Sequence, residues 1–445
     1  NDARAAYEAI LTATPEDARA YVALGAIYRS TSEWRKLVAL DEDFIPHAPA
    51  AERLAILREI RDTHGEKLGE KELAFIAACR VYKENVEDLA SAEALERLGM
   101  ETEAGEEMVA VLEDELDAIV TSQVKIASLR RIARIYADVL KDAPQSEAAL
   151  RKILDIEPSD LEALDALASL GAREDRYDKQ IAALEEKLGR VDEDVTRKSI
   201  LFEMARIWED RIGEVDEAIA ALQRVLEIDG SDVAGLDALA RIYDGQSRWS
   251  ELAHTLTRKV ELTQDPAASV ELRLRVAGLC ESELADSETA IHWYRGVLDF
   301  EAGHSGALAA LERLYTGLER WSELIWVFET QLGRSTDREE QIRILAKMAS
   351  IYEEQFDSAR DAALCYERVG QIDATHVPSV KNLERLLRQL GEWNRLIEVL
   401  QHHITLLSDQ QEATPVYLEV GEIYYRELSR VDKAEEIYNR ARELN

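Results

Sequence analysis

The chain has 445 residues, of which 46% are hydrophobic and 6% aromatic, and its 54 basic and 89 acidic residues leave a net charge of −35. This excess of carboxylates argues against nucleic acid and anionic membranes as partners, since phosphate groups need a basic face. It favours partners with basic or neutral patches. The sequence has no run of 18 apolar residues, so we expect no transmembrane helix and no direct membrane insertion.

Residues 1–15 have the pattern of a helix, and landmarks of this pattern return throughout the chain. Ala3 begins a column of small residues, and Trp34 begins a mostly aromatic column whose members stand 71 or 72 residues apart. A fixed period of this kind predicts a stack of helical repeats, with these residues as structural anchors. The predicted anchors are Trp34, Trp249, Trp321 and Trp393 in one aromatic column, Tyr136, Trp208, Tyr352 and Tyr424 in a second, and Ala218, Ala290, Ala362 and Ala434 among the small residues.

Residues 41–70 fit the repeat least well. His64 stands in an aromatic column and Arg61 in a small-residue column, with Pro46 and Pro49 nearby. Because proline interrupts a helix, we expect a distorted or shifted helix in this irregular repeat.

Residues 249–320 show one full period. Apolar residues at helical spacing predict four helices, at 249–262, 268–284, 287–300 and 305–318, with Ser305 as the N-cap of the last. The prolines fall mostly at helix junctions, and no Gly/Ser-rich linker interrupts the chain. We therefore predict one continuous domain over residues 1–445, and a segment of a longer array.

The columns resemble the tetratricopeptide repeat family. Leu24-Gly25 and Tyr28, followed by Trp34, match its first helix, and the small–aromatic pair Ala290 and Tyr294 matches its second. The resemblance implies an all-α, right-handed superhelical solenoid of antiparallel helix hairpins, about twelve of them in 72-residue double repeats. The family's glycine is often replaced here, as by Ala277 and Ala349.

Three features suggest chemistry at first sight, but none has the required pattern. Residues 303–307 resemble a nucleophile elbow but end in Ala307 instead of glycine and lie between helices. His402 and His403 are adjacent, so on a helix they point in different directions. The acidic clusters at 41–43 and 192–194 lack the spacing of a calcium loop. We therefore predict no catalytic residue, no cofactor and no metal, and a protein that is not an enzyme.

The cysteines, Cys79, Cys280 and Cys365, are odd in number and far apart. They have the pattern of small buried hydrophobic residues, without a disulfide framework. This favours a reducing compartment and hence the cytoplasm. The periplasm stays open, because the chain starts at Asn1 without a methionine. The excess of arginine over lysine favours a bacterial source.

A set of arginines recurs at related positions, which we call the arginine ladder. It consists of Arg97, Arg134, Arg206, Arg241, Arg313 and Arg385, and it skips Ser169. By resemblance these positions face the concave groove where peptides bind, so the ladder is the candidate partner-binding set. The favoured alternative is that each arginine pairs with a carboxylate of a neighbouring repeat, such as Glu209, Glu281 or Glu353.

The function expected from these features is a non-catalytic scaffold or adaptor that presents an extended concave groove to a protein or peptide partner. A first alternative is a structural component of a filament or of an envelope or motility machine. Ala3 and Ala434 share one phase without capping helices, which favours end-to-end self-association. A second alternative is a regulatory or sensor module of a larger protein.

Overall fold

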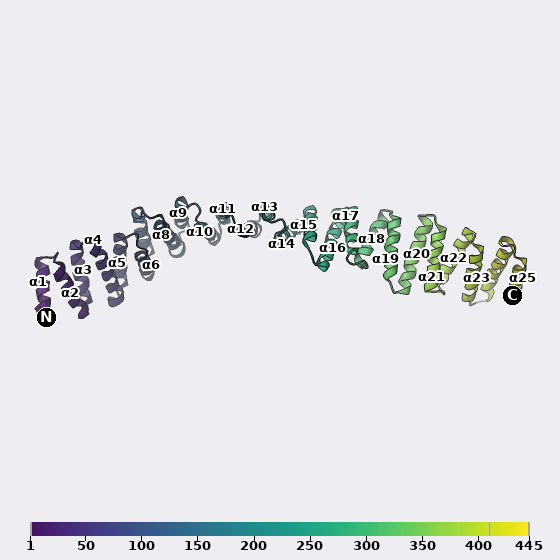
Figure 1. The fold of residues 1–445 in the computed structure, drawn as a ribbon, viewed down its shortest axis with the longest axis horizontal. Coiled ribbons are helices and arrows are strands. Elements are labelled where there is room, and N and C mark those ends of the chain that lie inside the picture. Colours follow the sequence, from purple (N-terminus) through teal and green to yellow (C-terminus); the bar gives the residue numbers. More distant parts are fainter. Residues whose placement is uncertain (1, 409, 444–445) are drawn as a thin grey trace. The chain divides into compact units, whose positions relative to one another are not determined.

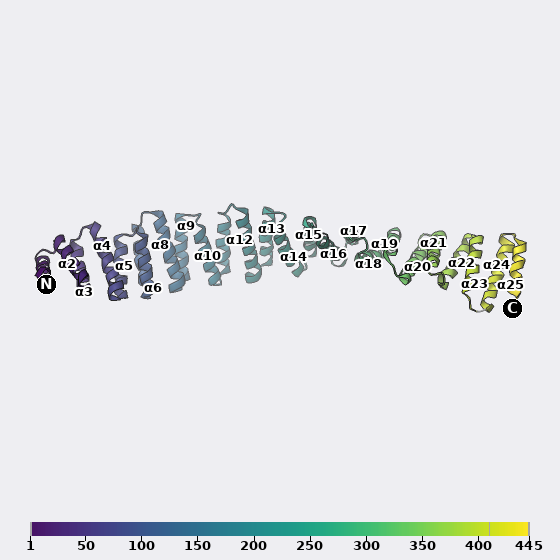
Figure 2. The same cartoon turned by 60° about the horizontal axis from the view of Figure 1, so that its bottom comes forward.

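The computed structural model describes residues 2–408 and 410–443, and within these residues every regular element is helical (Figure 1). The chain divides into two compact units, Asn1–Gly230 and Ser231–Asn445. In both views, successive helices of each unit lie side by side in chain order (Figures 1 and 2). The predicted all-α array of helix hairpins is confirmed.

The first unit contains thirteen α-helices among its described residues. They are α1 (Asp2–Ala13), α2 (Ala18–Ser30), α3 (Trp34–Phe44), α4 (Ala50–Asp62), α5 (Lys71–Glu84), α6 (Leu89–Glu101), α7 (Gly105–Asp114), α8 (Ser122–Ile135), α9 (Ala143–Ile156), α10 (Leu161–Arg173), α11 (Tyr177–Leu188), α12 (Asp194–Ile207) and α13 (Val215–Ile228). Short 3-10 turns follow α3 and α7, at η1 (Ile45–His47) and η3 (Leu116–Ala118). One π-helical turn follows each of α4, α8 and α12, at η2 (Thr63–Leu68), η4 (Tyr136–Leu140) and η5 (Trp208–Ile212).

The second unit continues the same pattern. Its described helices are α14 (Val233–Gly245), α15 (Trp249–Leu262), α16 (Pro266–Ser282), α17 (Ser287–Leu298), α18 (Ser305–Gly317), α19 (Trp321–Arg334), α20 (Arg338–Glu354), α21 (Ala359–Ile372), α22 (Val377–Leu390), α23 (Trp393–Leu406), α24 (Gln410–Glu422) and α25 (Val431–Glu443), with a π-helical turn η6 (Ile423–Glu427) after α24. The four helices expected in residues 249–320 are α15 to α18, each within two residues of its expected ends. No described helix in either unit has the length and apolarity needed to cross a membrane.

A column of capping residues starts every second hairpin. Asp88 and Asp160 accept backbone hydrogen bonds from Ser91 and Ala163, which satisfies a free N–H group of the first turn. Asp17 and Asp232 cap α2 and α14 in the same way. His304 and His376 take this position before α18 and α22. The prediction that Ser305 caps α18 is therefore wrong: the ring nitrogen of His304 accepts from the Ala307 N–H at 3.1 Å.

The irregular repeat of residues 41–70 breaks into short pieces. Helix α3 ends at Phe44, the 3-10 turn η1 contains Pro46, and α4 starts after Pro49. The π-helical turn η2 holds His64, whose Nδ1 lies 2.9 Å from a carboxylate oxygen of Glu70. Turns of this kind recur after α8, α12 and α24, and a second 3-10 turn, η3, follows α7 in the next period, so both η1 and η2 belong to the repeat, and what is particular to this segment is that prolines lie within and after η1.

The predicted anchors differ in burial. The small residues Ala218, Ala290 and Ala362 are fully buried, which lets neighbouring helices approach closely. The tryptophan anchors are all half-buried. Four of them begin a helix, Trp34, Trp249, Trp321 and Trp393, whereas Trp208 begins the π-helical turn η5 at the end of α12. Of the tyrosine anchors, Tyr424 is buried, and Tyr136 and Tyr352 are half-buried.

The turn between the two helices of a repeat contains a residue with a left-handed backbone. Gly213 has φ +85° after η5, and Ala285, one period of 72 residues later, has φ +52° after α16. A Cβ atom is unfavourable in this conformation, whereas glycine adopts it without strain. Nothing lies within 4 Å of a Cβ built on Gly213, so the difference between the two residues is one of backbone strain alone.

We predict that Ala285→Gly raises the stability of the second unit by about 0.5–1 kcal/mol and that Gly213→Ala lowers that of the first by about 1 kcal/mol. Thermal and urea unfolding followed by circular dichroism measures both. Gly278→Ala in the middle of α16 is the matched control: its Cβ would also meet nothing, and there alanine is the better residue. Destabilisation by Ala285→Gly would contradict the strain argument.

Candidate interaction site

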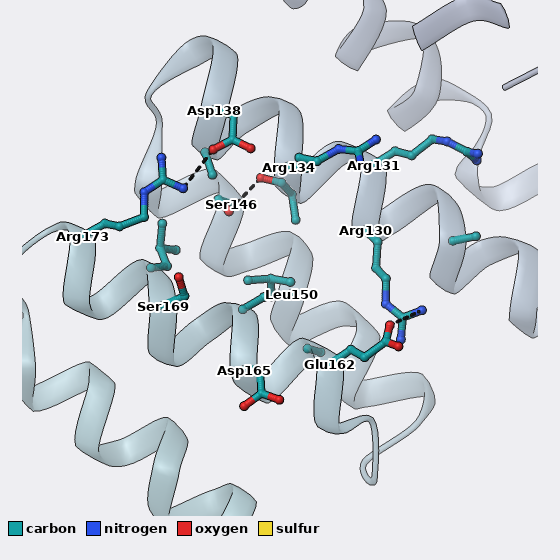
Figure 3. Close-up of a pocket in the computed structure, with 16 residues that line it drawn as sticks. Arg130, Arg131, Arg134, Asp138, Ser146, Leu150, Glu162, Asp165, Ser169 and Arg173 are labelled. Carbon is teal, nitrogen blue, oxygen red and sulfur yellow. Dashed lines mark hydrogen bonds and ion pairs between the residues drawn. The ribbon is translucent and has the colours of Figure 1, made fainter. Parts of the chain in front are cut away.

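A cavity of about 620 Å³ opens between α8, η4, α9 and α10 of the first unit (Figure 3). Its floor consists of small or apolar residues, among them Ala133, Ser146, Leu150, Ala166 and Ser169. Its rim carries charged side chains, which are Arg130, Arg131, Arg134, Asp138, Glu162, Asp165 and Arg173. The volume lies in the range of cavities that bind small ligands or partner side chains.

Hydrogen bonds hold the helices around this cavity in place. The Ser146 hydroxyl of α9 donates to the carbonyl oxygen of Ala133 in α8 at 2.8 Å, and both residues are buried. Asp160, the cap of α10, accepts hydrogen bonds from Arg130 of α8 and from the Ala163 N–H. Burial would raise the pKa of Asp160, but these two partners hold that pKa below its usual value. The walls of the cavity are therefore fixed before any partner arrives.

Two rim arginines pair with carboxylates of the same rim, Arg173 with Asp138 and Arg130 with Glu162 (Figure 3). Arg173 Nη1 donates to Asp138 Oδ1 at 2.9 Å, across the gap between α10 and η4. Arg131 and Arg134 both bind Glu96 of α6. A guanidinium has five N–H donors, so these arginines keep donors for a further acceptor. The Nη1 atom of Arg131 is buried and has no hydrogen-bond partner.

The structure places the six residues of the arginine ladder in different surroundings. Arg313 Nη2 lies 2.6 Å from Glu281 Oε1, and Arg385 Nη2 lies 2.6 Å from Glu353 Oε2. These are the neighbouring carboxylates that the alternative interpretation names. Arg134 binds Glu96, whereas Arg97 binds Glu101 on its own helix. Arg206 of α12 and Arg241 of α14 are exposed.

Of the ladder residues, Arg134 alone lines the 620 Å³ cavity. Sequence reasoning missed most of the others that line it, including Arg130, Arg131, Arg173 and Leu150. Two signals were present in the sequence. Three arginines stand within five residues at 130–134, and the ladder skips Ser169, which lies in the cavity.

The groups that suggested chemistry have structural roles. His304 caps a helix, and His403 is buried, with Nδ1 at 2.7 Å from Glu384 Oε1. Burial raises the pKa of the Cys79 and Cys365 thiols to about 11, so both are protonated near neutral pH. Among residues 2–408 and 410–443 no group of three or more His, Cys, Asp or Glu side chains is placed to hold a metal ion.

The sequence model described as "Tetratricopeptide repeat" matches residues 307–342 and 379–414. These ranges include most of α18 and α19 and of α22 and α23, so each starts on a helix capped by histidine. No curated protein matches the chain.

Several solved structures are similar over most of the chain at low identity. One is "Structure of Naa15/Naa10 bound to HypK-THB", with 14% identity and a TM-score of 0.36 over 95% of this chain and 68% of that chain. The human IFIT1 dimer with m7Gppp-AAAA has 16% identity and a TM-score of 0.24, and the human IFIT1 dimer with PPP-AAAA has 16% identity and a TM-score of 0.23. Both IFIT1 matches cover 88% of this chain and 90% of that chain.

We predict that Arg313→Glu lowers the melting temperature, because it replaces the contact with Glu281 by repulsion. The loss should be about 1 kcal/mol, since Arg313 is largely exposed and solvent screens the pair. The swap of Arg313→Glu with Glu281→Arg should recover most of it. Circular dichroism melting curves of the original chain, the two single variants and the swap measure the coupling. Equal stability of all four would show that the contact contributes nothing.

Proposed function

We propose that this chain, which carries tetratricopeptide repeats, is a non-catalytic scaffold that binds a protein partner on its exposed helix faces. The observation that carries the proposal is the 620 Å³ cavity of the first unit, because it is open and lined by small and apolar residues between helices that are tied in place. An uncovered apolar hollow with a polar rim is typical of a protein-binding surface.

The ties between helices explain how such a surface would bind. Contacts such as Arg173–Asp138 and Arg313–Glu281 each contribute little free energy, but they join helices of successive hairpins. A partner then meets side chains whose positions are already set, and less conformational entropy is lost on binding. Contacts spread over several hairpins would provide affinity, and the local hollows would provide specificity.

The side chains that could take part in catalysis have structural roles instead, which supports a non-catalytic function. Cys79 and Cys365 are protonated by burial, His304 is the cap of α18, and His403 lies against Glu384 inside the second unit. The partner is a protein in this proposal. Three statements about partners and roles stay predictions: that the chain does not bind nucleic acid, that it stacks end to end, and that it is a regulatory module of a larger protein. The cytoplasmic location and the single continuous domain also stay predictions.

We predict that Ala166→Trp, which fills the cavity, abolishes the binding of partner proteins that bind to the original chain. Ala166 lines the cavity, whereas Ala148, on the same unit, is exposed on α9 outside it, so Ala148→Trp is the matched control. Affinity purification from the source cells with quantitative mass spectrometry compares the three proteins. The proposal predicts at least a tenfold loss for Ala166→Trp alone, as for a central interface position. The same proteins in equal amounts on all three would contradict it.

A further inference from the structure

In the second unit, three side chains occupy the position that corresponds to the cavity of the first unit. Tyr294 of α17 donates its hydroxyl hydrogen bond to Glu281 Oε2 at 2.9 Å. Arg313 of α18 donates from Nε to Glu281 Oε1 at 2.8 Å. Burial and the hydrogen bond to Glu281 raise the pKa of Tyr294 to about 12. These three residues form a Tyr–Glu–Arg triad that closes the gap between α16, α17 and α18.

The next period of the second unit has the same residue types. Glu353, Tyr366 and Arg385 stand 72 residues after the members of the first triad. Arg385 Nη2 is 2.6 Å from Glu353 Oε2, and the Tyr366 ring is buried. The triad is therefore the usual filling of this place in the second unit.

The cavity of the first unit lies where this triad is missing. The residues that stand 144 positions before Glu281, Tyr294 and Arg313 are Ala137, Leu150 and Ser169. Each of these three smaller side chains lines the cavity. We call the space over Ala137, Leu150 and Ser169 the socket.

The helices around the socket keep the close packing of the filled repeats. Ala133 corresponds to Ala277 of the second unit, and both are buried. An arginine–carboxylate contact between helices is also present in both places. In the second unit Arg313 makes it, but Ser169 stands at the corresponding position here, and Arg173, one helical turn later, binds Asp138 instead. The socket is thus a place with smaller side chains than its counterpart in the second unit, beside an equally buried alanine and a retained contact between helices.

We propose that the socket binds one tyrosine or phenylalanine side chain of a partner polypeptide, next to an aspartate or glutamate of that partner. The partner ring takes the place that Tyr294 fills in the second unit, over Leu150. The partner carboxylate takes the place of Glu281 and accepts hydrogen bonds from Arg173 and Arg134. This inference rests on the proposed function, since it assigns the chemistry of the partner at the same cavity.

The charges around the socket suit a carboxylate. Arg134 and Arg173 are about half exposed, at 58% and 48%, so a partner can reach their free N–H donors. Residues 122–173 contain eight basic and eight acidic side chains, so this stretch is neutral within a chain of net charge −35. Anions are therefore repelled less here than the net charge of the chain suggests, because solvent ions screen the more distant carboxylates.

The floor of the socket suits an aromatic ring better than an aliphatic chain alone. The half-buried Ala137 and Ala166 offer apolar contact beside the buried Leu150, and the exposed Ser169 has a hydroxyl that can accept a hydrogen bond from a phenol. A rigid ring loses little conformational entropy on binding, and aromatic side chains dominate binding energies at protein interfaces. Polynucleotides are less suitable, because their successive phosphates would meet Asp138, Glu162 and Asp165 at the rim.

The test is a selection of random 12-residue peptides displayed on phage, carried out in parallel on the original chain and on a refilled variant. The refilled variant carries Ala137→Glu, Leu150→Tyr and Ser169→Arg, which restores the triad. We expect the original chain to enrich peptides with an aromatic residue next to an acidic one, and the refilled variant to bind them at least about tenfold more weakly. Ser169→Arg alone blocks the socket with one change and serves if the triple variant does not fold.

The reciprocal variant opens a second socket. Glu281→Ala, Tyr294→Leu and Arg313→Ser together remove the triad from the second unit, so the selected synthetic peptide should bind two sites per chain in isothermal titration calorimetry. A peptide in which the aromatic residue is replaced by leucine, and one in which the acidic residue is replaced by its amide, should each bind at least about fivefold more weakly.

The outcomes separate this inference from the proposed function. Peptides that bind the original and the refilled chain equally would leave the scaffold function standing and overturn the socket. Enrichment of peptides without the aromatic–acidic pair, or displacement of the selected peptide by an oligonucleotide, would also overturn it. If neither chain enriched any peptide, both the socket and the proposed protein-binding function would be contradicted.

Discussion

Within each unit, the described helices pack chiefly against their near neighbours in sequence, and this constraint governs the rest of the structure. A globular core can compensate for a poorly packed position from many directions, but an array of hairpins cannot. Each interface therefore has to be complete in itself. The buried alanine column, which includes Ala218, Ala290 and Ala362, meets this requirement by letting neighbouring helices approach closely.

The same constraint explains why charged side chains recur in register. Apolar contacts decide how near two helices lie, but they fix the rotation and sliding of one helix against another less well. Pairs such as Arg313–Glu281 and Arg368–Glu329 join helices of successive hairpins and add direction to the packing. Their individual free energies are small, so their effect lies in geometry more than in stability.

Much of the fold could be predicted from the sequence because the same residue types recur at the same positions in each repeat, so each pattern can be checked several times. The sequence predicts both ends of the helix at 249–262, and the alternative interpretation of the ladder names Glu281 and Glu353, which contact Arg313 and Arg385 in the structure. The cap of α18 was misplaced by one residue, because the aspartates of its column, such as Asp160 and Asp232, are replaced there by His304. Histidine is not among the usual N-cap residues, so local preference pointed to the adjacent serine.

The cavity could not be predicted in the same way, because it consists of what is missing. Sequence patterns report the side chains that are present, whereas this hollow arises from Ala137, Leu150 and Ser169 standing where larger residues occur elsewhere. The contact between α10 and η4 is made instead by Arg173, which binds Asp138 beside the gap. Such a shift by one helical turn is visible only when the pairs themselves are known.

The two kinds of left-handed turn have a consequence for how such a chain can change in length. Turns at Asp175, Ser247 and Glu319 alternate with turns at Lys141, Gly213 and Ala285, and the two kinds follow different helix ends. Removal of one hairpin would place a helix end that precedes one kind of turn next to a hairpin that normally follows the other kind. Removal of two hairpins, 72 residues, would restore every junction. The unit of gain and loss in this array is therefore the double hairpin, and a lineage of such chains should differ in length by whole double hairpins.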